Sequence, residues 1–464
     1  LRNDPRGGRC VSEAPILGAS LLAVLERPPV SGSVTPSVAW VEERRRQALR
    51  GFNERGLPSP REEAWRYTNV APLTRAKFVP ASADLSDEQR RSVDAEVAAA
   101  CKGLEDAQTH IFINGHHSSA SPENGASVVS SLRSSLGRSP ESLEPHLGQM
   151  VNESLSGFSA LNTAFFEDGA CLIVPPDIQS GIVHLIHVSA GDEAGLSIAR
   201  NVIVLEAGAQ AVVVESYLSA GEAAHFCSAA TEIVLGDSAT LDHYRVQSVG
   251  GNAYHIGAVE TNVGAGSVYR THHVAIGGKL SRVDANVTLG AEGAACEMNG
   301  LYVVTERQHS DFHTRIEHHY PDGRSDELFK GILADHGRSV FNGLVKVHPD
   351  AQRTDSTQAN HNLLLSENAE IDTKPELQIF ADDVKCAHGA TVGQLDDDMV
   401  FYLRSRGLDE SQARATLTYA FAEEVIQRMG LPAVRHRVKD SLNRALPEAA
   451  ELIPSEILFE QSGV

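Results

Sequence analysis

The feature that most constrains this chain is a long succession of short β-branched runs without amphipathic helices between them. The runs begin near Cys171, continue to Leu395 and are bounded by Gly, Asp or Ser. Apolar residues at the turns recur at spacings of 26 to 44 residues. These residues are Leu205, Leu235, Val263, Leu289, Leu333 and Leu365. Such repeats favour stacked coils over a doubly wound fold. We therefore predict a mainly β fold, a β-solenoid, although a β-sandwich also fits the pattern alone.

Patterns typical of helices flank this region on both sides. Apolar residues at helical spacing over residues 36–56 end at Gly56 and Pro58. Near the other end, Asp396–Asp398 and Asp409 can cap two helices. The predicted parts are an unstructured tail over residues 1–35, a helical and irregular N-terminal domain over 36–165, the solenoid over 166–395 and a helical C-terminal domain over 396–464.

Two stretches near the start of the chain are expected to be irregular. Ser118–Ser139 is rich in Ser and Gly, which is typical of a loop. Ala14–Leu25 is apolar and follows three arginines, as in a signal or transit segment, but it is too short to span a bilayer. Because Pro28 and Pro29 follow it, we interpret it as part of a poorly ordered tail.

The charge and the cysteines exclude several classes of function. The formal net charge of −21 argues against nucleic acid as the main partner, because phosphate binding needs clusters of Lys and Arg. The six cysteines include no C-x-x-C, so neither a zinc ribbon nor a self-contained iron–sulfur motif is present. Scattered free thiols suit a reducing compartment. The sequence has no G-x-x-x-x-G-K-[ST], so any ATP-driven step belongs to a partner.

The strongest chemical signal lies in Asp382–Gly407, which reads DDVKCAHGATVGQLDDDMVFYLRSRG. In an extended segment Cys386 and His388 point to the same side, about 6–7 Å apart along the strand. Thiolate and imidazole are ligands of iron, zinc and iron–sulfur clusters. A tetrahedral centre needs about four ligands, so the others would come from elsewhere in the fold or from another subunit. A cysteine that only fills space is the alternative interpretation.

A group of histidines offers a different metal site. Its members are His309, His313, His318 and His319. A cupin-like metalloenzyme could use His313 and His318 together with Glu317. The alternative is that these histidines have structural partners in the wall of the solenoid or at an interface.

A further alternative is a β-helix enzyme that acts on polysaccharides with grouped carboxylates in a surface groove. Its candidates are Asp382, Asp383 and Asp396–Asp398, although the last group is better explained by helix capping. Aromatic residues make up 5% of the chain and only two are Trp, which is a poor supply for stacking against sugars.

The block from Val340 to Gly407 resembles the signature of the SufD family, the scaffold subunits of the SUF iron–sulfur cluster assembly system. The similarity includes EAWRYTNV (Glu63–Val70) and LNTAFFEDG (Leu161–Gly169), and it extends from Trp40 to Gly430. The paralogous SufB subunits lack the K-C-x-H-G-A-T run in this block. The chain is therefore identified as a member of the SufD family rather than as a SufB.

The resemblance implies a right-handed parallel β-helix and a scaffold that is not an enzyme. It implies pairing with SufB through the β-helices, docking of the SufC ATPase on the C-terminal domain, and a transient iron–sulfur cluster at the SufB–SufD interface. Cys386 and His388 would belong to that shared site, which SufB completes, and His388 is the stronger candidate ligand. By family position, Tyr402, Arg404 and Arg406 would contact SufC.

The same resemblance sets the remaining expectations. No ATP site is expected on this chain, the resemblance does not decide whether the assembled complex binds flavin, and neither nucleic acid nor a membrane is an expected partner. A homodimer in the absence of SufB is an additional expectation, because exposed solenoid edges tend to pair. The expected compartment is the bacterial cytoplasm, or the plastid stroma if the source is a photosynthetic eukaryote.

Overall fold

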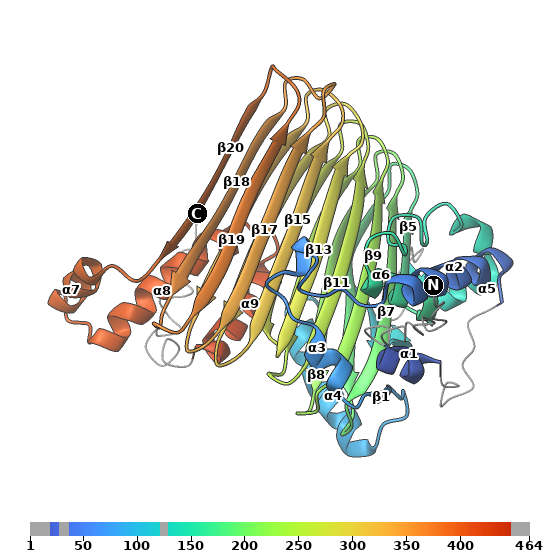
Figure 1. The fold of residues 1–464 in the computed structure, drawn as a ribbon, viewed down its shortest axis with the longest axis horizontal. Helices are drawn as coiled ribbons and strands as arrows, with labels where there is room; N and C mark the ends of the chain where they lie inside the picture. Colours follow the sequence, from blue (N-terminus) through green and yellow to red (C-terminus); the bar gives the residue numbers. More distant parts are fainter. Residues whose placement is uncertain (1–18, 27–36, 121–128, 447–464) are drawn as a thin grey trace, which may run out of the picture.

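The protein is built around a parallel β-solenoid, with helices at both ends of the chain (Figure 1). The computed structural model describes residues 19–26, 37–120 and 129–446. The solenoid strands alternate between two sheets, which we name the odd sheet and the even sheet after their strand numbers. The odd sheet contains β5 (Ala170–Val174), β7 (Gly195–Leu205), β9 (Phe226–Leu235), β11 (Tyr254–Val263), β13 (Leu280–Leu289), β15 (His309–His318), β17 (Arg338–Val347) and β19 (Glu370–Ile379). The even sheet contains β6 (Gln179–Ala190), β8 (Gln210–Ala220), β10 (Thr240–Val249), β12 (Val268–Gly277), β14 (Ala295–Val304), β16 (Arg324–Leu333), β18 (Asp355–Leu364) and β20 (Lys385–Gly393).

The apolar turn residues of the sequence explain how the coils stack. Leu205 pairs with Leu235, Leu235 with Val263, and Val263 with Leu289 across the odd sheet, so the four form one buried column. Leu333 belongs to the even sheet, where it pairs with Val304. The largest spacing in the series, the 44 residues from Leu289 to Leu333, therefore reflects a change from the odd sheet to the even sheet. The predicted mainly β solenoid is confirmed, and the sandwich alternative is wrong, because every solenoid strand runs parallel to its neighbours.

The main hydrophobic core lies between the two sheets. It is aromatic near its C-terminal end, where Phe312 of β15, Phe329 of β16 and Phe341 of β17 are fully buried. The ring centroid of Phe329 lies 5.3 Å from that of Phe312 and 5.1 Å from that of Phe341. Aromatic pairs at such distances add about 0.5–1.5 kcal/mol each beyond the area they bury.

The N-terminal region combines helices with four short strands. The helices are α1 (Ala19–Leu25), α2 (Ala39–Arg55), η1 (Glu63–Trp65), α3 (Ala71–Arg75), α4 (Asp87–Cys101), α5 (Leu132–Arg138), η2 (Pro140–Ser142) and α6 (Gly157–Phe165). The strands are β1 (Val79–Pro80), β2 (Gln108–Ile113), β3 (His116–Ala120) and β4 (Val129–Ser131). All four strands extend the solenoid sheets, which the expected helical and irregular region did not include. The N-terminal region is therefore joined to the solenoid by backbone hydrogen bonds as well as by side-chain packing.

Two expectations for the N-terminal region are wrong in part. The expected tail contains α1, whose Leu21 and Val24 are buried in one cluster with Trp65, while residues 1–18 and 27–36 lie outside the described residues. Even a short helix is stable when its apolar side chains pack against the rest of the protein.

The expected irregular stretch is also wrong in part. Within it, β4 and α5 are regular, and Leu132 and Leu136 of α5 are buried. Residues 121–128 lie outside the described residues. The Ser131 side chain caps α5 by accepting a hydrogen bond from the backbone N–H of Ser134, so a serine taken as a sign of loop marks a helix start.

Three helices follow the solenoid: α7 (Asp397–Ser405), α8 (Glu410–Gln427) and α9 (Pro432–Ala445). The Asp409 side chain caps α8 in a capping box with Gln412, as the sequence indicated. Tyr419 of α8 and Val438 of α9 are buried against the outer face of the even sheet in a cluster with Leu301. Among the described residues, no helix is long and apolar enough to span a membrane.

Candidate site at the terminal coil

The last coil of the solenoid leaves one edge of each sheet without a partner strand. Among the described residues, β19 pairs along its length only with β17, and β20 only with β18. Figure 1 shows β20 at the outer edge of the solenoid. The outward N–H and C=O groups of these two strands are therefore available to a strand of another chain.

The opposite end of the solenoid is closed by the N-terminal region. β4 runs antiparallel to β5, and β3 runs antiparallel to β2. Val41 of α2 and Leu136 of α5 are buried in one cluster with Val202 of β7. In solenoid proteins, terminal elements normally cover the last coil in this way. Within the described part of the chain, no antiparallel strand pairs with β19 or β20 at the C-terminal end.

The open end is apolar as well as unpaired. Ile379, Phe380 and Val392 lie at the ends of β19 and β20, and their exposed fractions are 39%, 60% and 49%. Ile379 and Phe380 lie at the rim where β20 begins, and Val392 lies near the other end of β20, so exposed apolar side chains occur at both ends of the uncovered edge and mark a site of protein–protein contact.

Cys386 and His388 lie on β20 in the row of side chains that points toward the solenoid interior. Cys386 is in register with Ser356 and His388 with Gln358, and both of these β18 residues are buried inside the solenoid. Because no further coil covers β20, Cys386 is half-buried and His388 is exposed. The alternation inferred from the sequence therefore holds, and both side chains sit at the open end.

The Cys386 side chain lies in partly apolar surroundings. Cys386 packs against the edge of a small apolar cluster that contains Val347 and Ala381. Burial, together with the charge of Asp355, raises the pKa of the Cys386 thiol. The thiol of the isolated chain is therefore protonated at neutral pH, and it becomes a good metal ligand only where a cation or a metal ion lowers that pKa.

The chain does not complete a metal site around these two residues. In the described ranges, the only group of three or more His, Cys, Asp or Glu side chains close enough to share a metal ion is elsewhere, at Glu317, His319 and His348. Cys386 and His388 therefore remain two ligands of an incomplete set, as the sequence indicated.

The histidines at 309–319 do not form the cupin-like site. His313 lies on the outer face of β15, where its Nε2 is 3.2 Å from Asp311 Oδ1. His318 points into the solenoid, where its Nε2 is 2.9 Å from Ser325 Oγ. Because neighbouring side chains of a strand point to opposite faces, His313 and His318 cannot share an ion. The set His313, His318 and Glu317 is therefore wrong.

Of the carboxylates of the polysaccharide alternative, that of Asp396 has a structural role at the end of the solenoid. Asp396 caps α7, since its side chain accepts hydrogen bonds from the backbone N–H groups of Asp398 and Met399. The backbone N–H of Asp383 donates to Gln352 Oε1 in the neighbouring turn. The helix-cap interpretation is confirmed for Asp396.

Helix α7 carries the residues expected to contact a partner, together with Met399, which the sequence analysis missed. Tyr402 is half exposed, the Arg406 guanidinium lies 5.2 Å from its ring centroid, and Arg404 Nη1 is 3.5 Å from Glu410 Oε2. Phe401 is 72% exposed and Met399 is 49% exposed. Apolar residues on more than one face of this short helix were the available signal, because only part of such a helix can pack against its own chain.

Comparison with known proteins assigns both parts of the fold. Residues 187–421 match the SufBD core domain of the SUF system for FeS cluster assembly, and residues 34–181 match the SufBD N-terminal region. The chain belongs to the SufBD family. The SufBD core match runs from β6 into α8 and so contains the terminal coil and α7.

Individual SufBD relatives support the same assignment. An iron–sulfur cluster assembly SufBD family protein of Synechocystis is 34% identical over 405 residues, which are 83% of this chain and 87% of that protein. The iron–sulfur cluster assembly protein SufD of Escherichia coli is 29% identical over 406 residues, which are 87% of this chain and 93% of that protein. The chloroplastic protein ABCI7 of Arabidopsis thaliana is 32% identical over 249 residues, about half of each chain. The predicted SufD family resemblance is confirmed.

Proposed function

We propose that this SufBD protein is the non-catalytic SufD-type scaffold of a complex with SufB and SufC in which iron–sulfur clusters are assembled. The observation that carries the proposal is the open end of the solenoid, where β19 and β20 leave both sheets unpaired beside exposed apolar residues. A second solenoid of the same family has the strand geometry needed to continue both sheets. SufB is the proposed partner, and a homodimer would use the same edges when SufB is absent.

The proposed shared site uses the side chains that such pairing would cover. His388 is exposed at the open end and offers an imidazole to iron, while Cys386 lies two residues earlier on the same side of β20. Ligands from SufB would complete the set. The cluster is the product of the assembly and passes on to other proteins, so this chain needs only a part of its ligands.

The proposed SufC contact is the exposed face of α7, with Met399, Phe401 and Tyr402 as its apolar part and Arg404 and Arg406 as its charged rim. Helices α8 and α9 anchor α7 by packing on the even sheet. A force on α7 would therefore be transmitted to the solenoid. ATP is bound and hydrolysed by SufC in this proposal, in the bacterial cytoplasm or the plastid stroma.

Val392→Lys is expected to reduce the amount of SufB that co-purifies with this chain at least about tenfold, because a charge pointing inward on an edge strand prevents pairing. Val392 is 49% exposed, so the thermal unfolding midpoint of the isolated chain should change little. The matched control is Ile178→Lys, which places the same charge on a 44% exposed residue before β6. Equal recovery of SufB with both variants would exclude the terminal coil as the interface.

Phe401→Glu is expected to reduce SufC binding at least about tenfold while SufB pairing is retained, because exposed aromatic anchors contribute most to such interfaces. A point substitution is a more specific test than deletion of residues 396–464, because the deletion would also expose the apolar surface of the even sheet under α8 and α9. Leu155→Glu, on a 42% exposed apolar residue of the N-terminal region, is the control. Pull-down of SufC by both variants at the wild-type level would contradict the docking proposal.

A further inference from the structure

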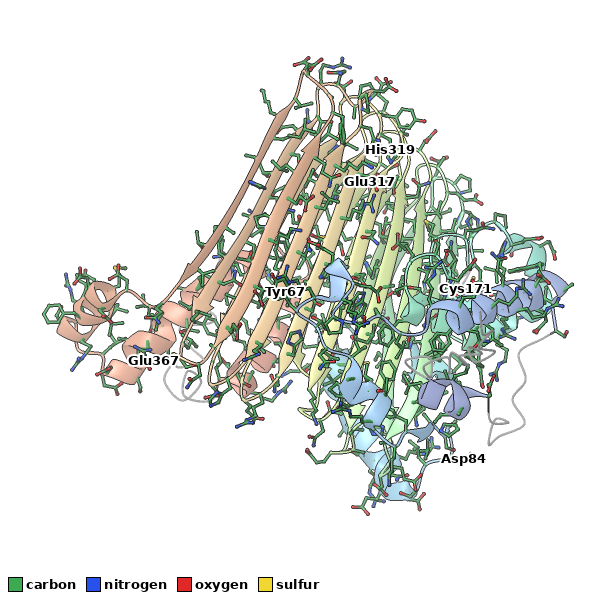
Figure 2. All side chains as sticks on the ribbon, viewed as in Figure 1. Tyr67, Asp84, Cys171, Glu317, His319 and Glu367 are labelled. Carbon is green, nitrogen blue, oxygen red and sulfur yellow. The ribbon has the colours of Figure 1, made fainter. Side chains whose placement is uncertain are left out.

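Three side chains at the rim of the solenoid converge on one point. Figure 2 shows Glu317 and His319 together at the rim where β15 ends. His348 Nε2 lies 2.8 Å from Glu317 Oε2, and His319 Nε2 lies 3.5 Å from the same oxygen. The three ligand atoms are within 4.8 Å of one another. An ion bound at roughly 2.1 Å from each atom would hold them roughly 3–3.5 Å apart, so small side-chain rotations suffice.

The stacking of the coils fixes the two histidines side by side. His318 is in register with Val347 in the last pair of β15 and β17, so His319 and His348 occupy the same place in successive coils. The backbone N–H of His348 donates to His318 O at 2.9 Å, and that of His319 donates to Leu289 O at 3.3 Å. The two imidazole rings are stacked with centroids 3.9 Å apart. A site whose backbone is held on both sides in this way is organised before an ion arrives.

The carboxylate is oriented by its neighbours. Arg315 forms an ion pair with Glu317 Oε1, which leaves Oε2 to face the two histidines. Lys346 Nζ lies 3.9 Å from Oε2, so an ammonium competes with any cation at this point. The side chains of Glu317, His319 and His348 are 16%, 37% and 25% exposed, so further ligand positions are open to water or to a second molecule. These features describe a site from which an ion can be exchanged.

We propose that Glu317, His319 and His348 bind a divalent first-row transition-metal cation. Two imidazoles and one carboxylate with open positions are the ligand set typical of mononuclear iron(II) sites. No other residue of the chain is required as a ligand. Binding involves no redox step, because the cation replaces the contacts that His319 and His348 make with Glu317 Oε2.

The position of the site suggests what the cation is for, and this step rests on the proposed function. The backbone N–H of Phe380 donates to Val347 O at 2.9 Å, so the turn that leads into β20 stacks directly on the strand end that carries His348. The rim site is therefore one coil from the open end that carries Cys386 and His388. Iron(II) held there is available to the assembling cluster as cargo.

Anaerobic titration of the purified chain with Co(II) tests the metal site. Co(II) serves as the probe because its visible absorption reports imidazole and carboxylate ligation. We expect saturable binding by the wild-type chain and at least about tenfold weaker binding by His348→Ala and by His319→Ala, since ligand sites weaken by such factors even when outer partners are removed. The control is His336→Ala, which removes an exposed histidine from a turn elsewhere on the solenoid. Equal binding by all four proteins would overturn the proposal.

Lys346→Gln separates a metal site from a structural cluster. Removal of the competing ammonium should tighten Co(II) binding, whereas a purely structural ion-pair group would be weakened and would gain no affinity for metal. Unchanged or weaker binding by this variant would contradict the assigned geometry. The titration uses the chain without partners, so its failure leaves SufB pairing intact and is distinguishable from failure of the proposed function.

The role as cargo is tested in the assembled complex. His348→Ala should slow the loading of iron into the complex when iron(II) is limiting, while the ratio of co-purified subunits stays unchanged. Restoration of the wild-type rate by excess iron(II) is also expected, because the site raises the local supply of iron and does not hold the finished cluster. A wild-type rate at limiting iron(II) would confine the site to metal binding without a role in assembly.

Discussion

Glu232→Ala is expected to lower the free energy of unfolding by about 3–5 kcal/mol, the usual cost of breaking a buried ion pair by removing one partner. Glu232 lies on β9, and neither its side chain nor that of its partner Arg200 on β7 is exposed to solvent. Arg200 Nη2 lies 2.6 Å from Glu232 Oε2. Loss of the carboxylate would leave this guanidinium without its counter-charge inside the protein.

The same carboxylate holds the N-terminal region against the solenoid. It accepts hydrogen bonds from the backbone N–H groups of Gly148, Met150 and Val151 at 2.7–3.0 Å. Each of these groups would lose its acceptor in Glu232→Ala, and a buried group without a partner costs about 1–3 kcal/mol. The damage is therefore expected first at the segment before α6, which covers the first coils of the solenoid.

Denaturant unfolding and hydrogen exchange measure the two parts of this expectation. The exchange of the amides of residues 148–151 should accelerate more than that of the core strands, because these amides lose their acceptor directly. Glu222→Ala, on an exposed turn, is the control and should change stability by less than about 0.5 kcal/mol. A loss below about 1 kcal/mol for Glu232→Ala would show that the buried network adjusts without this carboxylate.

The sequence is informative where local pattern decides the structure. The turn residues predict the solenoid because every coil repeats the same geometry, and the acidic residues Asp396 and Asp409 predict two helix starts because a cap is a local interaction. Cys386 and His388 share a side of β20 because alternation along a strand is local too.

Contacts between coils could not be predicted in the same way. His319 and His348 meet only through the register of β15 with β17, and no period within either segment reveals that register. His348 lies in a block that the sequence analysis used only for the family resemblance. The strands β2 and β4 were missed for a related reason, since their partners β6 and β5 lie far along the chain.

His388→Ala is expected to reduce the iron and sulfide content of the assembled complex at least about tenfold, while the fold and the ratio of subunits stay unchanged. The fold should be insensitive because His388 is exposed at the end of the solenoid and supports no packing. The iron and sulfide content should fall because removal of a metal ligand weakens metal binding more than removal of an outer hydrogen-bond partner, which alone weakens it about 10–100-fold. Cys386→Ser should have a smaller effect, since burial raises the pKa of this thiol and so disfavours the thiolate.

The measurement is anaerobic iron and sulfide analysis of the complex and of the isolated chain, with His361→Ala as the control. His361 lies on β18 next to β20, between the interior-facing residues Asn360 and Asn362, so it points to the opposite side from His388. The isolated chain should show no iron–sulfur absorption in any variant, because it has only two of the ligands. A wild-type iron and sulfide content in the His388→Ala complex would remove His388 from the site. A stable cluster on the isolated chain would contradict the sharing of ligands between subunits, and the open end of the solenoid would then serve pairing alone.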